Sequence, residues 1–428
     1  MTSAELLEDN SMIRDIMSRA SRSKLRLDMP SVRFTLSSLK ARTLKTSSST
    51  LVLHFDVNET IMVGDPAGGD TFDDCLSKMI AKNVYIRQRK RGNDLSAWEW
   101  SDGSSLLSSS PVTSGQSTQN PPPLITTWNV PSGLMSFYKS PFKKGYVKRF
   151  LSKESPGHVF GSFAKCLKEN LRLPSEKTVD KRLTHDGKHY FILPAFFRTL
   201  AKLDESGKDF RVVIRTFGTD GADIAKAINA WAEGKHPMFE GRRFPKYQID
   251  LDKHLFIGRY DKSSNMYSVR RANADGSASP TSPVFGESSV VAMFESKVPK
   301  VQVLQDHYQW WKSHDYSPSA GKPLWIDWSQ KNVHHIFFDD NIHNDASDSI
   351  VSIRIRRYSN RLFRPLSGES IRLLQGYFLV RVPTVCPILD HMWFLKQIEQ
   401  CEKNRKNLFF GQSTGLRTRL FDEAGGGA

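Results

Sequence analysis

The chain has 428 residues, with 61 Lys and Arg against 45 Asp and Glu, which gives a formal charge of 61 − 45 = +16. Such a length allows one large domain with insertions, or two or three ordinary domains. The positive charge favours anionic partners, namely phosphorylated metabolites, nucleic acid or an acidic membrane surface. No apolar run approaches the roughly 20 residues that span a bilayer, which argues against a transmembrane helix.

Cysteine usage points to a reducing compartment. Cys75, Cys166, Cys386 and Cys401 are widely spaced and form no CxxC pair. This spacing argues against a structural zinc site and against a disulfide framework. We therefore expect a cytoplasmic protein, and the basic run at residues 87–91 leaves a nuclear location open.

The first ordered element is expected after a polar leader. Residues 1–48 are rich in Ser, Arg and Lys, and we expect them to be disordered. The apolar run LVLHF at residues 51–55 stops at Asp56 and has the length of a buried parallel strand.

An insertion is expected at about residues 86–190. Its first part, residues 86–127, is irregular and rich in Ser and Pro, which predicts a long surface loop. Residues 134–153 are basic, with six Lys and Arg side chains among Phe and Tyr.

The middle of the chain reads as helix, strand and helix. We predict a helix at 191–203, a buried strand at 210–215 that ends at Thr216, and a helix over ADIAKAINAWA, residues 222–232. Residues 240–300 read as a β-rich insertion. A further helix is predicted at 301–314.

The last part contains three more strands and a helix. The run VHHIFF, residues 333–338, stops at the pair Asp339–Asp340, and strands are also expected at 349–354 and 377–382. A long helix is expected at 390–404.

Strands that alternate with helices predict an α/β protein with a Rossmann-like parallel sheet, covered on both faces. Ligands of such sheets bind beyond the carboxyl ends of the strands. Three predicted strands end there in polar residues: Asp56, Thr216 and Asp339–Asp340.

Each of these residues has two interpretations when taken alone. Asp56 could be a nucleophile toward a phosphoryl group or a turn residue that bonds its own backbone. Thr216 could bind a phosphate oxygen or cap a helix. Lys322 could neutralise charge in a transition state or belong to a plain Gly-Lys-Pro loop.

The adjacent carboxylates of Asp339 and Asp340 follow a strongly apolar strand. Burying them is costly unless a cation lies beside them, and Mg²⁺ with oxygen ligands is the usual solution. The alternative is an exposed acidic turn.

The order of these pieces along the chain resembles the haloacid dehalogenase-like (HAD-like) hydrolase superfamily, in a divergent form. Residues 51–63 are similar to its first motif, an apolar strand followed by Asp-x-Asp-x-Thr. Residues 210–216 are similar to the second motif and 335–345 to the fourth. Lys322 is the candidate for the third motif, with Lys297 and Lys312 as alternatives.

The resemblance implies a HAD-like core at residues 49–410. The segments at about 86–190 and 240–300 would be caps that select the substrate, and 411–428 would be a loose tail. As part of the first cap, the basic segment 134–153 would lie where it could meet an anionic substrate.

It also implies roles for single residues. Asp56 would attack phosphorus and form an aspartyl-phosphate. Thr60, Thr216 and Lys322 would bind the phosphoryl oxygens.

The same resemblance implies a Mg²⁺ site. Its ligands would be Asp56, Asp339, Asp340 and the backbone carbonyl of Asn58, and Asp345 would support them from behind.

Asn58 is the one departure from the pattern. Phosphatases of this superfamily usually carry a second Asp there, two residues after the nucleophile, as general acid and base. An amide has no proton to exchange near neutral pH, and general acid–base help contributes about 10²–10⁴-fold. Glu59 and His54 are the nearest substitutes in the sequence, and neither is convincing.

Two functions therefore remain open. One is a Mg²⁺-dependent phosphohydrolase or phosphotransferase that acts on a phosphorylated small molecule or another anionic substrate. The other is a non-catalytic or strongly impaired protein that binds phosphate and metal. Non-specific contact with nucleic acid, driven by the charge alone, is a third and less favoured interpretation.

Overall fold

The computed structural model describes residues 49–64, 69–107, 121–174, 179–239, 241–261, 263–264, 266–343, 347, 349–358, 362–410, 415–416 and 418–420. The expected leader at residues 1–48 lies outside this described part.

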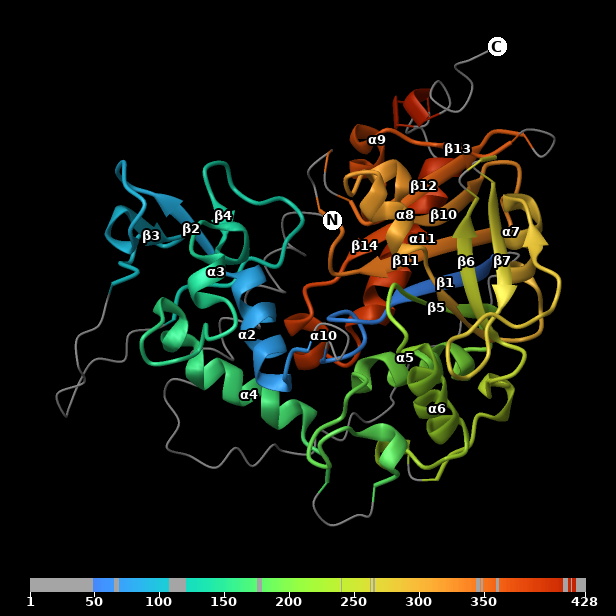
Figure 1. The fold of residues 1–428 in the computed structure, drawn as a ribbon, viewed down its shortest axis with the longest axis horizontal. Coiled ribbons are helices and arrows are strands. Elements are labelled where there is room, and N and C mark those ends of the chain that lie inside the picture. The colour runs from blue at the N-terminus through green and yellow to red at the C-terminus, as the bar shows by residue number, and fades with distance from the viewer. Residues whose placement is uncertain are drawn as a thin grey trace.

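A central sheet of eight strands runs through the molecule in the order β14-β11-β1-β5-β9-β6-β7-β8 (Figure 1). Neighbouring strands from β14 to β6 are parallel, and β7 and β8 extend one edge in antiparallel fashion. The predicted α/β class with a mostly parallel sheet is thus confirmed. The strands are β1 (Thr50–Asp56), β5 (Phe210–Thr216), β6 (Leu255–Tyr260), β7 (Tyr267–Arg271), β8 (Val284–Phe285), β9 (Val301–Gln305), β11 (Val333–Asp339) and β14 (Leu379–Arg381).

The sheet is buried on both faces because its strands are apolar on both. Successive side chains of a strand point to opposite faces. Leu51, Leu53 and Phe55 accordingly join one hydrophobic cluster, with α5, α6 and α11, whereas Val52 joins another, with α7 and β10. The α-helices are α2 (Phe72–Asn83), α3 (Lys143–Tyr146), α4 (Gly161–Leu171), α5 (Pro194–Glu205), α6 (Gly221–Ala232), α7 (Glu287–Glu295), α8 (Tyr308–Ser313), α9 (Gly368–Arg372), α10 (Val385–Leu389) and α11 (Trp393–Phe410).

Two smaller sheets accompany the central one. The first has the order β10-β12-β13, and the second has the order β3-β2-β4. Their strands are β10 (Lys322–Asp327), β12 (Val351–Arg356), β13 (Arg364–Pro365), β2 (Tyr85–Gln88), β3 (Trp98–Trp100) and β4 (Met135–Ser136). Short 3₁₀ turns are η1 (Leu95–Ala97), η2 (Phe137–Lys139), η3 (Pro156–Phe160), η4 (Lys181–Leu183), η5 (Pro237–Phe239), η6 (Pro245–Tyr247) and η7 (Pro318–Ala320).

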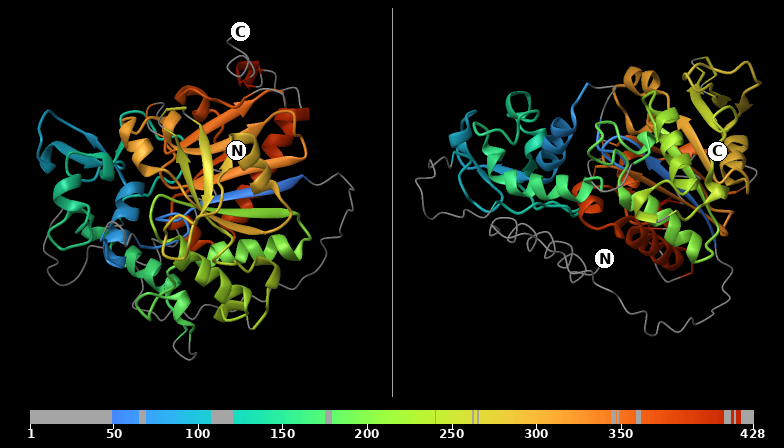
Figure 2. Two further views of the ribbon diagram at one scale, coloured as in Figure 1. Left: turned by 45° about the vertical axis from the view of Figure 1, so that its right-hand side comes forward. Right: turned by 90° about the horizontal axis from the view of Figure 1, so that it is seen from below.

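The β3-β2-β4 sheet and α3 form a module beside the core (Figure 2). A long irregular loop at 86–127 is therefore wrong for the described residues 86–107. The indole rings of Trp98 and Trp100 are buried and pack edge-on against Phe142 and Phe150. The prediction of a loop was based on the Ser and Pro content of the segment, which does not indicate an aromatic core.

Residues 240–300 do not form a separate β-rich cap. Strand β6 pairs with β9, β7 pairs with β6, and the central sheet is thereby extended. The single helix predicted at 301–314 is also wrong, because Val301 and Val303 pair with β5 and only α8 is helical. The Val-rich run forms β9 because it pairs with the otherwise unpaired edge of β5. This tertiary interaction outweighs the helical pattern of the local sequence.

The other predicted elements are present. The runs at 51–55, 210–215 and 333–338 are β1, β5 and β11, and the later runs correspond to β12 and β14. The helices predicted at 191–203, 222–232 and 390–404 are α5, α6 and α11, with shifted ends. In the segment expected to be a loose tail, Leu420 is buried in a hydrophobic cluster, so that expectation is wrong there.

Among the described residues, no helix combines the length and the apolar character that crossing a membrane requires.

Candidate metal and phosphate site

The site begins at the carboxyl ends of β1 and β11. These strands are adjacent and parallel, with Phe55 opposite Phe338, so Asp56 and Asp339 reach the same edge of the sheet. Carboxylate oxygens of Asp56, Asp339 and Asp340 all lie within 4.8 Å of one another. The three residues are at most 6% exposed. The predicted convergence of three carboxylates is confirmed, and their oxygens form a donor set that suits a hard divalent cation.

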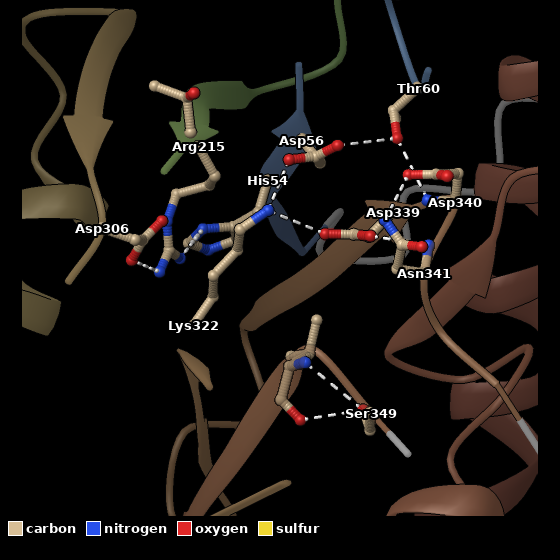
Figure 3. A network of polar contacts seen from close by, with 12 residues as sticks. His54, Asp56, Thr60, Arg215, Asp306, Lys322, Asp339, Asp340, Asn341 and Ser349 are labelled. Atoms are coloured by element: carbon tan, nitrogen blue, oxygen red, sulfur yellow. Dashed lines mark hydrogen bonds and ion pairs between the residues drawn. The ribbon is translucent and has the colours of Figure 1, made fainter. Parts of the chain in front are cut away.

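Short hydrogen bonds fix the orientation of these carboxylates (Figure 3). The Thr60 hydroxyl donates to Asp56 Oδ2 at 3.0 Å and accepts from the backbone N–H of Asp340 at 3.1 Å. The backbone N–H of Asn341 donates to Asp339 at 2.8 Å, and its side-chain amide donates to Asp340 at 3.0 Å. Thr60 thus ties the two strand ends together.

Lys322 reaches the same place from the first residue of β10. Its ammonium donates to Asp56 and, at 2.9 Å, to Asp339, and its side chain is 1% exposed. The Gly-Lys-Pro triplet is therefore not a plain loop. Burial lowers the pKa of Lys322, but the charges of Asp339 and Asp56 outweigh that effect and raise it. The lysine stays charged at neutral pH.

A second lysine, which the sequence did not single out, enters from α2. Lys82 Nζ lies 2.5 Å from Asp340 and 2.6 Å from Glu59. Lys78, one turn earlier, lies 3.9 Å from Glu59 and pairs with Asp70. The only sequence signal was this pair of lysines four residues apart, which also suits an ordinary solvated helix face.

Carboxylates outnumber ammonium groups in this cluster. Counting only the groups joined by contacts of 3 Å or less, the carboxylates of Asp56, Asp339, Asp340 and Glu59 and the ammonium groups of Lys322 and Lys82 give a formal charge of −4 + 2 = −2. Burial and the nearby Asp339 raise the pKa of Asp56, and burial is also the main cause of the raised pKa of Asp340. A divalent cation would remove the excess charge.

Thr216, at the end of β5, faces a different group. Its hydroxyl donates to Asp220 Oδ1 at 2.7 Å and accepts from the backbone N–H of Gly218 at 2.9 Å. The amide nitrogen of Asn58, assigned from its surroundings, donates to Asp220 Oδ2 at 3.3 Å and to the carbonyl oxygen of Gly64 at 3.1 Å. Burial raises the pKa of Asp220. Asp220 is thus a second acidic group that sequence reasoning missed.

The remaining predicted residues stand as follows. The side chain of Asn58 is directed to Asp220, and metal binding by its backbone carbonyl remains a prediction. Asp345 lies outside the described residues. Glu59 is engaged in an ion pair with Lys82, which also pairs with Asp340.

His54 belongs to a polar network inside the sheet. Arg215 can only donate hydrogen bonds, and its Nη1 lies 3.1 Å from His54 Nδ1. His54 Nε2 lies 3.0 Å from His335 Nδ1, whose Nε2 lies 3.1 Å from Glu295. Burial first, and then the charge of Arg215, lower the pKa of His54. Both ring nitrogens of His54 are occupied within this interior network.

A cavity of about 220 Å³ opens beside the carboxylates. Its walls come from α2, from the module around β4 and from the segment after β14, and they include Lys82, Tyr138, Lys139, Asp340 and Arg381. The Lys143 ammonium lies 4.0 Å above the ring of Tyr138. The predicted basic segment 134–153 therefore contributes to this cavity through Lys139.

Comparison with protein-family models, with curated proteins and with solved structures finds no match for this chain.

Proposed function

We propose that this protein is a Mg²⁺-dependent phosphohydrolase or phosphotransferase, a divergent HAD-like hydrolase that forms an aspartyl-phosphate on Asp56. The observation that carries the proposal is the meeting of Asp56, Asp339 and Asp340 with the ammonium of Lys322 at one sheet edge. A nucleophile, a cation site and a fixed positive charge are the parts that phosphoryl transfer requires.

Asp56 is prepared for attack by its two neighbours. Thr60 holds Oδ2 at 3.0 Å and Lys322 holds Oδ1, so the carboxylate has one orientation. One of its oxygens forms a bond to phosphorus while the bond from phosphorus to the leaving oxygen breaks. The Lys322 ammonium balances charge on the phosphoryl oxygens during this step. This nucleophile is prepared by its fixed position and by charge compensation. As a carboxylate it needs no general base to remove a proton.

The carboxylate set fits Mg²⁺. It offers only oxygen ligands and it is buried. Together with Glu59, Lys322 and Lys82 it has a formal charge of −2, which Mg²⁺ would neutralise. When bound, Mg²⁺ supplies positive charge shared between these carboxylates and the phosphoryl oxygens. Asp339 and Asp340 would hold the ion, with Asp56 as the ligand that also reacts.

The cavity beside Asp340 supports an anionic substrate. Lys82, Lys139 and Arg381 line it together with Tyr138, so a ligand there would meet cations and one aromatic ring. This composition, and the charge of +16, favour a phosphorylated small molecule. Within the basic segment 134–153, Lys148 is less suited to contact substrate, because it pairs with Asp70 at 2.9 Å.

The test is hydrolysis of p-nitrophenyl phosphate with Mg²⁺, with EDTA, and with the Asp56→Asn variant. We expect a rate that requires Mg²⁺ and that falls at least about 10³-fold in Asp56→Asn, because no nucleophile remains. Trapping of radiolabelled phosphate on the wild-type chain but not on the variant would identify the intermediate. Asp180→Asn, at an ion pair distant in sequence from the site residues, is the matched control.

A second candidate function follows from Asn58. If the wild type and the Asp56→Asn variant show the same background rate, the catalytic proposal is wrong and a protein that only binds metal and phosphate remains. In that case Mg²⁺ would still raise the melting temperature of the wild type.

A further inference from the structure

Asp220 occupies an unusual position for its residue type. It is the N-cap residue of α6, where Asp normally accepts a hydrogen bond from a backbone N–H of the first turn. Here the side chain makes no such cap. Its two oxygens instead face Thr216 and Asn58, at 2.7 and 3.3 Å. The helix therefore lacks a stabilising side-chain cap. The carboxyl group is instead directed to Asn58, the position at which phosphatases of the resembling family carry their general acid.

The other acidic groups near the nucleophile are already engaged. Glu59 lies 2.6 Å from Lys82, and Asp70 pairs with Lys78 and Lys148. His54 is held in the interior network by both ring nitrogens. Asp220, in contrast, has no Lys or Arg ion pair among the described residues, and it lines a cavity of about 630 Å³ together with Met62 and Gly64. This cavity is separate from the one beside Asp340, and it leaves the carboxyl group of Asp220 accessible from outside.

We propose that Asp220 is the general acid and base of the reaction, and that Asn58 is a positioning residue that holds it. The inference rests on the proposed function, since it assigns the proton transfers of that same site. Phosphatases of the resembling family carry this carboxyl group two residues after the nucleophile. Here it would come from the N-terminus of α6, the helix that follows the neighbouring strand β5.

The proton balance closes with Asp220 alone. Protonated Asp220 gives its proton to the leaving oxygen as the bond from that oxygen to phosphorus breaks and Asp56 becomes phosphorylated. The resulting Asp220 carboxylate then takes one proton from water. The hydroxide part of that water bonds to phosphorus, the bond from phosphorus to Asp56 breaks, and inorganic phosphate leaves. Asp56 is again a carboxylate and Asp220 is again protonated.

The experiment compares two substrates with Mg²⁺ in the full-length protein. p-Nitrophenolate leaves without a proton, whereas the alkoxide of glycerol 2-phosphate does not. We expect Asp220→Asn to lose about 10²–10⁴-fold on glycerol 2-phosphate and much less in the first turnover of p-nitrophenyl phosphate. Phosphorylated Asp56 should accumulate, because no base activates water.

Two further variants complete the test. Asn58→Asp combined with Asp220→Asn should recover at least about tenfold on glycerol 2-phosphate, since general acid–base help is worth more than that. Asp250→Asn is the matched control, because Asp250 pairs with the exposed Lys253 and lines neither the cavity at Asp220 nor the one beside Asp340. It should keep the wild-type rates on both substrates.

The outcomes are separable. An equal loss on both substrates in Asp220→Asn, without phosphorylated protein, would overturn the inference while Asp56-dependent hydrolysis by the wild type upheld the proposed function. Absence of Asp56-dependent hydrolysis in the wild type would remove both. If Asp220→Asn melts below the assay temperature, Asp220→Glu decides: it keeps a carboxyl group, so its preference between the substrates should stay within about tenfold of wild type. A larger shift would overturn the inference.

Discussion

Two buried polar regions of this protein lie within a few residues of each other and differ in their charge. In the interior network, Arg215 forms a two-pronged ion pair with Asp306, at 2.6 and 2.9 Å, and both are at most 2% exposed. At the edge of the sheet, the cluster around Asp56 has two more carboxylates than ammonium groups. A buried ion pair with balanced charge needs no further partner. A buried excess of negative charge destabilises the fold unless a cation compensates it.

The difference follows from position in the sheet. Arg215 and His54 lie within or at the last residues of strands, where neighbouring strands and α7 exclude solvent. The carboxylates lie just beyond, where the backbone turns away and a cavity opens. The interior network is therefore expected to serve stability, and the edge cluster to serve binding.

The largest expected effect lies in the interior. Arg215→Met should destabilise the protein by about 3–5 kcal/mol, because it leaves the buried carboxylate of Asp306 without its partner. Urea denaturation measures this loss. Arg182→Met, at a partly exposed ion pair, should cost about 1 kcal/mol or less. Equal costs for the two variants would contradict the distinction between the regions.

Mg²⁺ should stabilise the edge cluster. A concentration 100 times the dissociation constant adds about 2.7 kcal/mol to the free energy of unfolding, if the unfolded chain does not bind the ion. Thermal melting with Mg²⁺ and with EDTA measures the shift, and NaCl at equal ionic strength is the control. Identical melting temperatures in all three conditions would mean that the excess charge does not mark a cation site.

Acid should act on the interior histidines. Burial lowers the pKa of His236 from 6.5 to about 3, as it lowers that of His54. The unfolded state then binds more protons than the folded state below pH 6.5, so stability falls as pH falls. For His236 the loss is about 1.6 kcal/mol between pH 6.5 and pH 5.

His236→Phe tests this loss. Its ring lies 5.0 Å from that of Tyr190 in a stacked arrangement, which Phe can retain. The variant should lack this acid-dependent contribution. The difference in unfolding free energy between wild type and variant should therefore shift by about 1.6 kcal/mol over this range. A constant difference from pH 6.5 to pH 5 would count against an uncharged His236.

The smallest effect has an unusual sign. Asp56→Asn should modestly stabilise the metal-free protein, because it removes one of the excess buried negative charges, and burial and the nearby Asp339 already raise the pKa of Asp56. Lys322 can still donate to the remaining oxygen. Urea denaturation in EDTA measures this gain, and in Mg²⁺ the order of stability should reverse. Destabilisation in EDTA would show that the site is balanced without a cation.

Much of the site could be predicted because its residues belong to short, recognisable sequence patterns. Asp56 and Asp339–Asp340 each follow an apolar run of strand length, and the parallel alternation of strands and helices places such ends at one edge. Thr60 followed from the same motif.

Other elements could not be read from the chain. Residues 301–305 carried a pattern compatible with helix, and β9 forms because β5 offers a free edge. Lys82 and Asp220 looked like an ordinary helix lysine and an ordinary turn residue, since nothing local distinguishes a side chain that faces solvent from one that faces a site.

The sequence by itself determined the class of fold and the types of chemical group available, because periodicity and strand-end residues are properties of short segments. The tertiary structure decided which charges meet. Electrostatic interactions fall off with distance in space and not along the chain, so the ion pair of Lys82 with Asp340 was decided only by the packing of α2 beside the end of β11.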